Sequence, residues 1–175
     1  MTTLFFTRIA ALMVSLSCSA QVFTVGRAGH GRMSELSPAQ KAVLAPALQN
    51  ATGEQTPDIL RSFTVFAVPL SNNDSPAIIA ISVKVGCGVN PNCEFLVFRQ
   101  HGNKDIPILS DVAGDWDFNS TRHHGYLDLT LTNYQGVHRV LSIWQFDGNQ
   151  YCMTSRTDRS SDGTQKKLLV NHCRV

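Results

Sequence analysis

The chain has 175 residues, the length of a single domain, and 43% of them are hydrophobic, which is enough to form a core. Charged residues make up only 16% and the formal net charge is +2. These values exclude an intrinsically disordered chain and give no overall electrostatic reason to bind nucleic acid or a membrane surface.

The first twenty residues have the organisation of a secretory signal peptide. Arg8 gives a short basic region, residues 9–16 form an apolar stretch too short to span a bilayer, and residues 18–20 are the small residues of a cleavage site. Lipid attachment at Cys18 is the alternative, although Ser15 stands where a lipobox has an aliphatic residue. The sequence therefore predicts a secreted or periplasmic protein without a membrane span.

Export to an oxidising compartment makes the four later cysteines candidates for disulfides. The expected pairs are Cys87 with Cys93, which would close a short turn-forming loop, and Cys152 with Cys173, which would tie the last strand to the chain end. A zinc site is disfavoured because the cysteines lack C-x-x-C spacing.

Residues 21–36 are rich in glycine and carry no periodic pattern, so we expect a flexible segment there. A short helix is predicted over residues 38–49, because Ser37 and Gln40 form a capping-box pattern at its start. Pro46 should limit this helix to one or two turns.

From residue 63 onwards, short β-branched and aromatic runs alternate with turn-forming residues. Seven strands are predicted, over residues 63–70, 77–85, 94–100, 105–112, 126–134, 139–146 and 151–157. They indicate a mainly β domain over residues 37–175: an antiparallel sandwich or a curled, barrel-like sheet of about seven to eight strands, with the helix on one face or end.

Two parts of this domain are similar in sequence. Residues 77–110 align with residues 125–157, so that Phe98 matches Trp144 and Gly102 matches Gly148. The spacing is close to that of a propeller blade, but two units cannot close a propeller. We therefore expect two hairpin-type repeat units around one core.

The second unit carries a series of short motifs between residues 114 and 151. They comprise, in chain order, Asp117, Asn119, Gly125, Asp128, Leu129, Phe146, Asp147, Gly148 and Tyr151. Together these motifs resemble a degenerate repeat of the FG-GAP/VCBS kind, in a small exported bacterial protein of unknown function. In intact repeats of that family the acidic loop binds calcium, which prefers several converging oxygen ligands.

The calcium ligands that this resemblance implies are Asp115, Asp117, Asn119 and Asp128. The loop departs from the family pattern, because Thr121 stands where the third acidic residue belongs and Arg122 is inserted nearby. A cation in the loop opposes bound Ca²⁺. The alternative, with no cofactor, is that these side chains hydrogen-bond the loop backbone.

His123 and His124 follow in the same loop. Either could act as a general base with Asp115 or Asp128, an arrangement that would suit a small secreted hydrolase. Adjacent residues of a strand point to opposite faces, which argues against chelation of one metal ion by both. No nucleophile motif or phosphate-binding glycine loop accompanies the pair, so no catalytic residue is assigned.

Aromatic residues also gather in this half of the chain, where most should fill the core and an exposed subset would form a flat binding surface. The candidate binding residues are Trp116, His123, His124 and Tyr126. The sequence thus favours an exported, non-catalytic domain that binds a macromolecule, either a protein or a carbohydrate, and not nucleic acid. The His/Asp hydrolase and a calcium-stabilised structural module are the alternatives.

Overall fold

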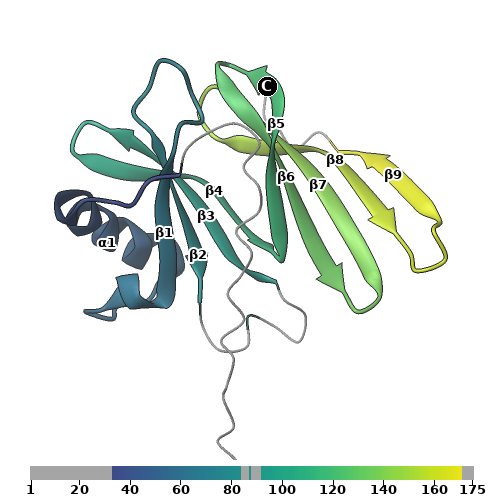
Figure 1. Ribbon diagram of the computed structural model, residues 1–175, viewed down its shortest axis with the longest axis horizontal. Helices are drawn as coiled ribbons and strands as arrows, with labels where there is room; N and C mark the ends of the chain where they lie inside the picture. The colour runs from purple at the N-terminus through teal and green to yellow at the C-terminus, as the bar shows by residue number, and fades with distance from the viewer. Residues whose placement is uncertain (1–32, 84–86, 88–91, 171–175) are drawn as a thin grey trace, which may run out of the picture.

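The computed structural model describes residues 33–83, 87 and 92–170; the predicted signal peptide and Cys173 lie outside this part. The strands form two antiparallel sheets, in the orders β1-β2-β3-β4 and β5-β6-β7-β8-β9, so the predicted mainly β, sandwich-like fold is confirmed and no barrel closes within the described residues (Figure 1). The elements are α1 (Pro38–Thr52), η1 (Ile59–Ser62), β1 (Phe63–Val68), β2 (Ala77–Ser82), β3 (Cys93–His101), β4 (Lys104–Ala113), β5 (Asp115–His123), β6 (Tyr126–Gln135), β7 (His138–Phe146), β8 (Tyr151–Arg159) and β9 (Gln165–Leu169).

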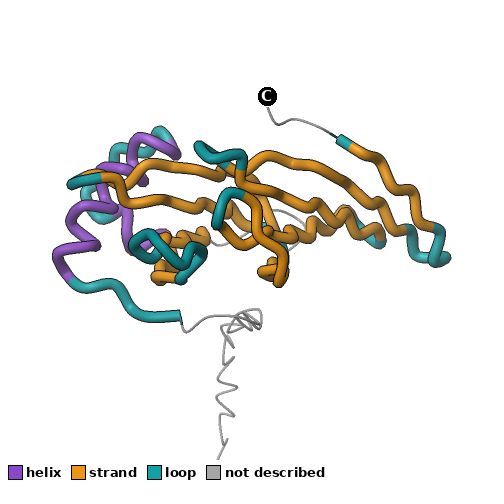
Figure 2. The backbone as a smooth tube through the Cα atoms, turned by 90° about the horizontal axis from the view of Figure 1, so that it is seen from above, coloured by secondary structure: helices purple, strands orange, loops and turns teal. Residues whose placement is uncertain are grey.

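The four-stranded sheet is buried on both faces. Because successive residues of a strand point to opposite faces, β1 sends Phe66 and Val68 into the cluster between the sheets, and Phe63 and Ala67 into a cluster beneath α1. This double burial explains why β1 is an almost continuous apolar run. Figure 2 shows the result: α1 lies at one end of an elongated molecule, and the far strands of the second sheet form the other end.

Helix α1 begins as predicted and ends later. The capping box is present, because the Gln40 N–H donates to Ser37 Oγ at 3.3 Å and the Ser37 N–H donates to Gln40 Oε1 at 2.9 Å. The helix nevertheless continues through Pro46 to Thr52, so the expected limit of one or two turns is wrong. Pro46 lies on the exposed side, where water can bond the carbonyl that proline leaves without a donor, while Leu48 anchors the buried side.

The end of the segment that was expected to be flexible is attached to the sheet. Ser34 and Ala67 exchange two backbone hydrogen bonds, of 3.1 and 2.9 Å, as an antiparallel bridge on the outer edge of β1. Two residues later Leu36 is 4% exposed and belongs to the cluster beneath α1. Burial of Leu36 therefore anchors residues 34–36 to the domain, while residues 21–32 of the segment expected to be flexible lie outside the described part.

Strand β5 occupies the region that the sequence analysis treated as a calcium-type loop. Its core-facing Trp116 and Phe118 alternate with Asp115 and Asp117, which is the period of a half-buried strand. The acidic residues that resemble metal ligands form the exposed face of this strand. Strand β9, a short hairpin partner of β8, was also missed, because all of its residues are exposed and carry no apolar periodicity.

The two similar sequence units lie in different sheets. Residues 77–110 contribute to β2, β3 and β4 of the first sheet, and residues 125–157 contribute to β6, β7 and β8 of the second. Each unit has a register shift at a matching position, between Val97 and Phe98 in one and between Ile143 and Trp144 in the other. Each unit therefore forms an antiparallel meander within its own sheet, and a common origin of the two stays a prediction.

Candidate functional site

The hairpin between β5 and β6 places His123 beside a buried carboxylate. Its two turn residues, His124 and Gly125, both have positive φ angles, of 46° and 84°, which is the pattern of a type I′ turn. This turn puts His123 opposite Tyr126 in the register, at the last position of β5. His123 therefore lies in the sheet, and His124 lies at the tip of the hairpin.

Asp128 is 2% exposed and accepts hydrogen bonds from three side chains. Its Oδ1 lies 2.7 Å from His123 Nδ1, and its Oδ2 accepts from Thr121 Oγ1 at 2.6 Å and from Gln145 Nε2 at 3.3 Å. The carboxylate is an acceptor, so Nδ1 is the protonated nitrogen and Nε2 is left for solvent or a ligand. The His123 side chain is 45% exposed, so this second nitrogen belongs to a solvent-accessible ring.

Two neighbours complete the surroundings of this pair. Arg122 Nη1 donates to the backbone oxygens of Leu70, at 2.7 Å, and Gly125, at 3.0 Å, which ties the hairpin to the end of β1. The Tyr151 hydroxyl donates to Leu127 O at 2.6 Å. Burial, followed by the negative charge of Asp128, raises the pKa of Tyr151 far above its usual value, so this hydroxyl stays protonated.

The four candidate calcium ligands do not converge. Asp115 and Asp117 are exposed along β5, where Asp115 Oδ1 accepts the Trp116 N–H at 2.8 Å. Asn119 accepts from Thr130 at 3.2 Å, and Asp128 is occupied as described above. Within the described ranges, no three His, Cys, Asp or Glu side chains are grouped so as to hold a metal ion. Folding of the loop as a strand spreads its acidic residues along an edge.

Two of the four candidate binding residues are core residues instead. Trp116 is 7% exposed and packs against Phe66, Phe95 and Phe118 between the sheets. Tyr126 is 3% exposed and stacks on Phe146, and burial together with a 2.7 Å hydrogen bond to Asp74 raises the pKa of Tyr126 to about 12. Of this set, only His123 and His124 are exposed to a partner.

The first predicted disulfide is present, between Cys87 and Cys93. Asn92, next to it, bonds the backbone of Tyr134 through both of its side-chain polar atoms, at 2.7 and 2.8 Å, and so joins this loop to β6 in the other sheet. Cys152 is buried at the start of β8, while its predicted partner Cys173 lies outside the described residues, so that pair stays a prediction.

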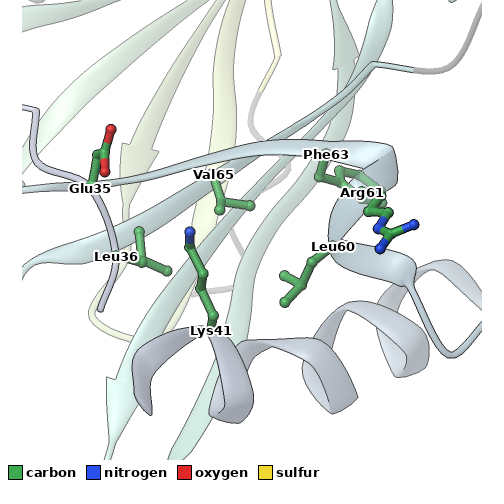
Figure 3. Close-up of a pocket in the computed structure, with 7 residues that line it drawn as sticks. All are labelled: Glu35, Leu36, Lys41, Leu60, Arg61, Phe63 and Val65. Atoms are coloured by element: carbon green, nitrogen blue, oxygen red, sulfur yellow. The ribbon is translucent and has the colours of Figure 1, made fainter. Parts of the chain in front are cut away.

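The structure also contains a pocket that the sequence did not indicate. It has a volume of about 410 Å³ and lies between α1 and β1 (Figure 3). We call it the α1–β1 groove; its lining residues are Glu35, Leu36, Lys41, Leu60, Arg61, Phe63 and Val65. They come from the segment before α1, from α1, from η1 and from β1, so no local sequence pattern connects them.

The α1–β1 groove has an apolar floor and a charged rim. Leu36 and Phe63 are buried, and Leu60 and Val65 are half-buried, all four as part of the cluster beneath α1. Lys41 and Arg61 are exposed, with Glu35 as the one opposing charge in the lining. Such a combination suits a ligand with an apolar part and a polar or anionic end.

Comparison with protein-family models, with curated proteins and with solved structures finds no match for this chain. The resemblance to FG-GAP/VCBS repeats therefore stays a prediction. In the part of the chain that the structure describes, every helix is too short or too polar to cross a bilayer.

Proposed function

We propose that this protein is an exported domain that binds another protein in the α1–β1 groove. The groove carries the proposal, because it combines about 410 Å³ of concave space, an apolar floor and charged groups at the rim. A disulfide between Cys87 and Cys93 is compatible with an extracellular or periplasmic location. Export is supported further by the signal-like pattern of residues 1–20.

The lining of the groove favours binding over catalysis. Its polar groups are the carboxylate of Glu35 and the cations of Lys41 and Arg61, all exposed to solvent. The lining includes no histidine, cysteine or hydroxyl side chain to act as a nucleophile, and its possible proton carriers, Glu35 and Lys41, are exposed to solvent. An exposed rim of this kind gives orientation and specificity to a bound partner.

The test compares retention of proteins from an envelope extract of the source organism by two variants. Lys41→Glu with Arg61→Glu reverses the rim charges, whereas Lys104→Glu with Arg159→Glu makes the same net change at exposed positions of other strands. We expect a protein that the wild type and the control variant retain and that the groove variant loses. Equal retention by all three, or by none, contradicts the proposal.

A second candidate function is hydrolysis at His123. The 2.7 Å contact with buried Asp128 favours it, because a carboxylate that holds Nδ1 prepares Nε2 to take a proton from water. Hydrolysis of chromogenic carboxylic and phosphoric esters by the wild type and by His123→Gln measures this directly. Activity that the substitution abolishes would support the enzyme, and identical rates would eliminate it.

A further inference from the structure

We infer that the partner segment is the free carboxyl end of an extended chain with an apolar last residue, added as a short antiparallel strand to β1. This inference rests on the proposed function and names the chemistry that the α1–β1 groove recognises. Strand addition to an open sheet edge supplies main-chain hydrogen bonds, and a side-chain pocket and a carboxylate site then give specificity.

The outer edge of β1 already accepts an antiparallel segment. Ala67 exchanges both backbone hydrogen bonds with Ser34, and so points its N–H and C=O away from β2. In an antiparallel ladder this direction alternates, so Val65, two positions earlier, points the same way. The chain leaves the edge after Ser34 to start α1, and no backbone bond joins Leu36 to Val65 within the described residues. The edge of β1 at Val65 is therefore open where it borders the groove.

The floor of the groove provides the site for one apolar side chain. Leu36, Leu60, Phe63 and Val65 surround it, and their burial continues into the cluster beneath α1. Figure 3 shows Leu36 and Leu60 on either side of the groove, beneath the β1 ribbon that carries Val65 and Phe63. A residue of the added strand that points toward α1 would place its side chain between these four residues.

The charges give the direction of the added strand. Figure 3 shows Glu35 and Arg61 at opposite ends of the groove, with Arg61 beside Phe63 at the start of β1. A segment antiparallel to β1 runs from the Glu35 end to the Arg61 end, so its terminal carboxylate meets Arg61. Lys41 reaches toward the middle of the groove, between Leu36 and Val65, and adds positive charge along the strand (Figure 3). Arg61 forms an exposed ion pair with Asp58, at 3.4 Å, which contributes little stability and which a ligand carboxylate can replace.

The experiment measures binding of short fluorescent peptides by polarisation. One mixture is randomised upstream and ends in Leu, Val or Phe as a free acid; a second is identical but has a C-terminal amide; a third ends in Ser as a free acid. We expect the apolar free acids to bind at least about tenfold more tightly than the amides or the Ser-terminated peptides. Lys41→Ala with Arg61→Ala should reduce that affinity to the level of the amides, while Lys104→Ala should leave it unchanged.

Three results overturn the inference: equal affinity for acids and amides, normal affinity of the double variant, or no binding of any mixture up to about 1 mM. Its failure can be separated from that of the proposed function. If a protein in the extract still depends on Lys41 and Arg61 for retention, the groove binds a partner of another chemistry. If nothing depends on these residues in either experiment, both proposals fail.

Discussion

Asp128 is the side chain on which the end of the β5–β6 hairpin depends. It is a buried anion whose two oxygens receive three hydrogen bonds, from His123, Thr121 and Gln145. A buried charge is tolerated only with such partners, and the loss of the acceptor leaves its donors unsatisfied in a partly dry site. Its contribution to stability therefore holds whether or not His123 takes part in any reaction.

We predict that Asp128→Ala lowers the free energy of unfolding by about 2 kcal/mol, because three donors lose a charged acceptor. Asp117→Ala, an exposed position on the same hairpin, should change it by less than about 0.5 kcal/mol. Urea denaturation of both variants gives the comparison. Equal stability of the two would show that the hydrogen-bond cluster around Asp128 is not what holds the hairpin.

Asp105 is a buried carboxyl whose Oδ2 has no hydrogen-bond partner among the described residues. Burial raises its pKa above the ordinary value of 3.8, so the folded protein binds this proton more tightly than the unfolded chain. The protonated form of Asp105 therefore stabilises the folded protein below pH 3.8. This stabilisation is lost as the pH rises through the pKa of the folded state.

Asp105→Asn should therefore raise the melting temperature at pH 7 by about 3 °C, because an uncharged amide carries a smaller desolvation cost. The gain should shrink as the pH falls towards 3.8, where the aspartate itself becomes protonated. Scanning calorimetry across this range checks the prediction, with exposed Asp117→Asn as the control. A gain that stays constant with pH would contradict the assigned cause.

Among the strands, those with clear alternation or continuous apolar runs were recognised from the sequence, and β5 and β9 were not. In β5 the alternation is limited to Trp116 and Phe118, and the acidic residues beside them also fit the pattern of a metal-binding loop. Helix α1 passes Pro46 because packing of Leu44 and Leu48 outweighs the lost backbone bond. Local sequence patterns thus predict elements that bury one of their own faces. They fail where packing between elements determines the structure.

The short loop closed by Cys87 and Cys93 connects the two sheets, because Asn92 bonds to Tyr134 in β6. Cys87→Ala with Cys93→Ala should destabilise the protein by about 2 kcal/mol in the chain-entropy description. Thermal melting measures the loss. If the double variant melts at the wild-type temperature, the disulfide does not stabilise this loop. If Cys152 and Cys173 form a second disulfide, reductant should lower the melting temperature of the double variant further.

The α1–β1 groove could not be predicted from the sequence, because its residues come from separate segments of the chain. Its lining combines Leu36, Lys41, Arg61 and Val65, which meet only after α1 has packed across the first sheet. The sequence offered His123 or His124 with Asp115 or Asp128, and the β5–β6 hairpin brings one of these pairs, His123 and Asp128, into contact. A constellation within a hairpin can be inferred from spacing, whereas a groove between a helix and a sheet edge depends on the packing of the two.

As a whole, the protein is a helix-covered sheet facing a second sheet that extends away from it (Figures 1 and 2). The two distinctive places, the α1–β1 groove and the His123–Asp128 pair, lie on different sheets. A ligand that binds one of them should therefore leave the backbone of the other undisturbed. This separation makes the position of a bound partner a decisive observation.

Titration of the ¹⁵N-labelled protein with the apolar free-acid peptides, followed by amide chemical shifts, locates that position directly. We predict that the largest changes fall on Val65, Leu36 and Lys41, with little change at His123 and Gly125. Changes concentrated on the β5–β6 hairpin, or no change anywhere, would contradict the assignment of the α1–β1 groove as the site that binds apolar carboxyl ends.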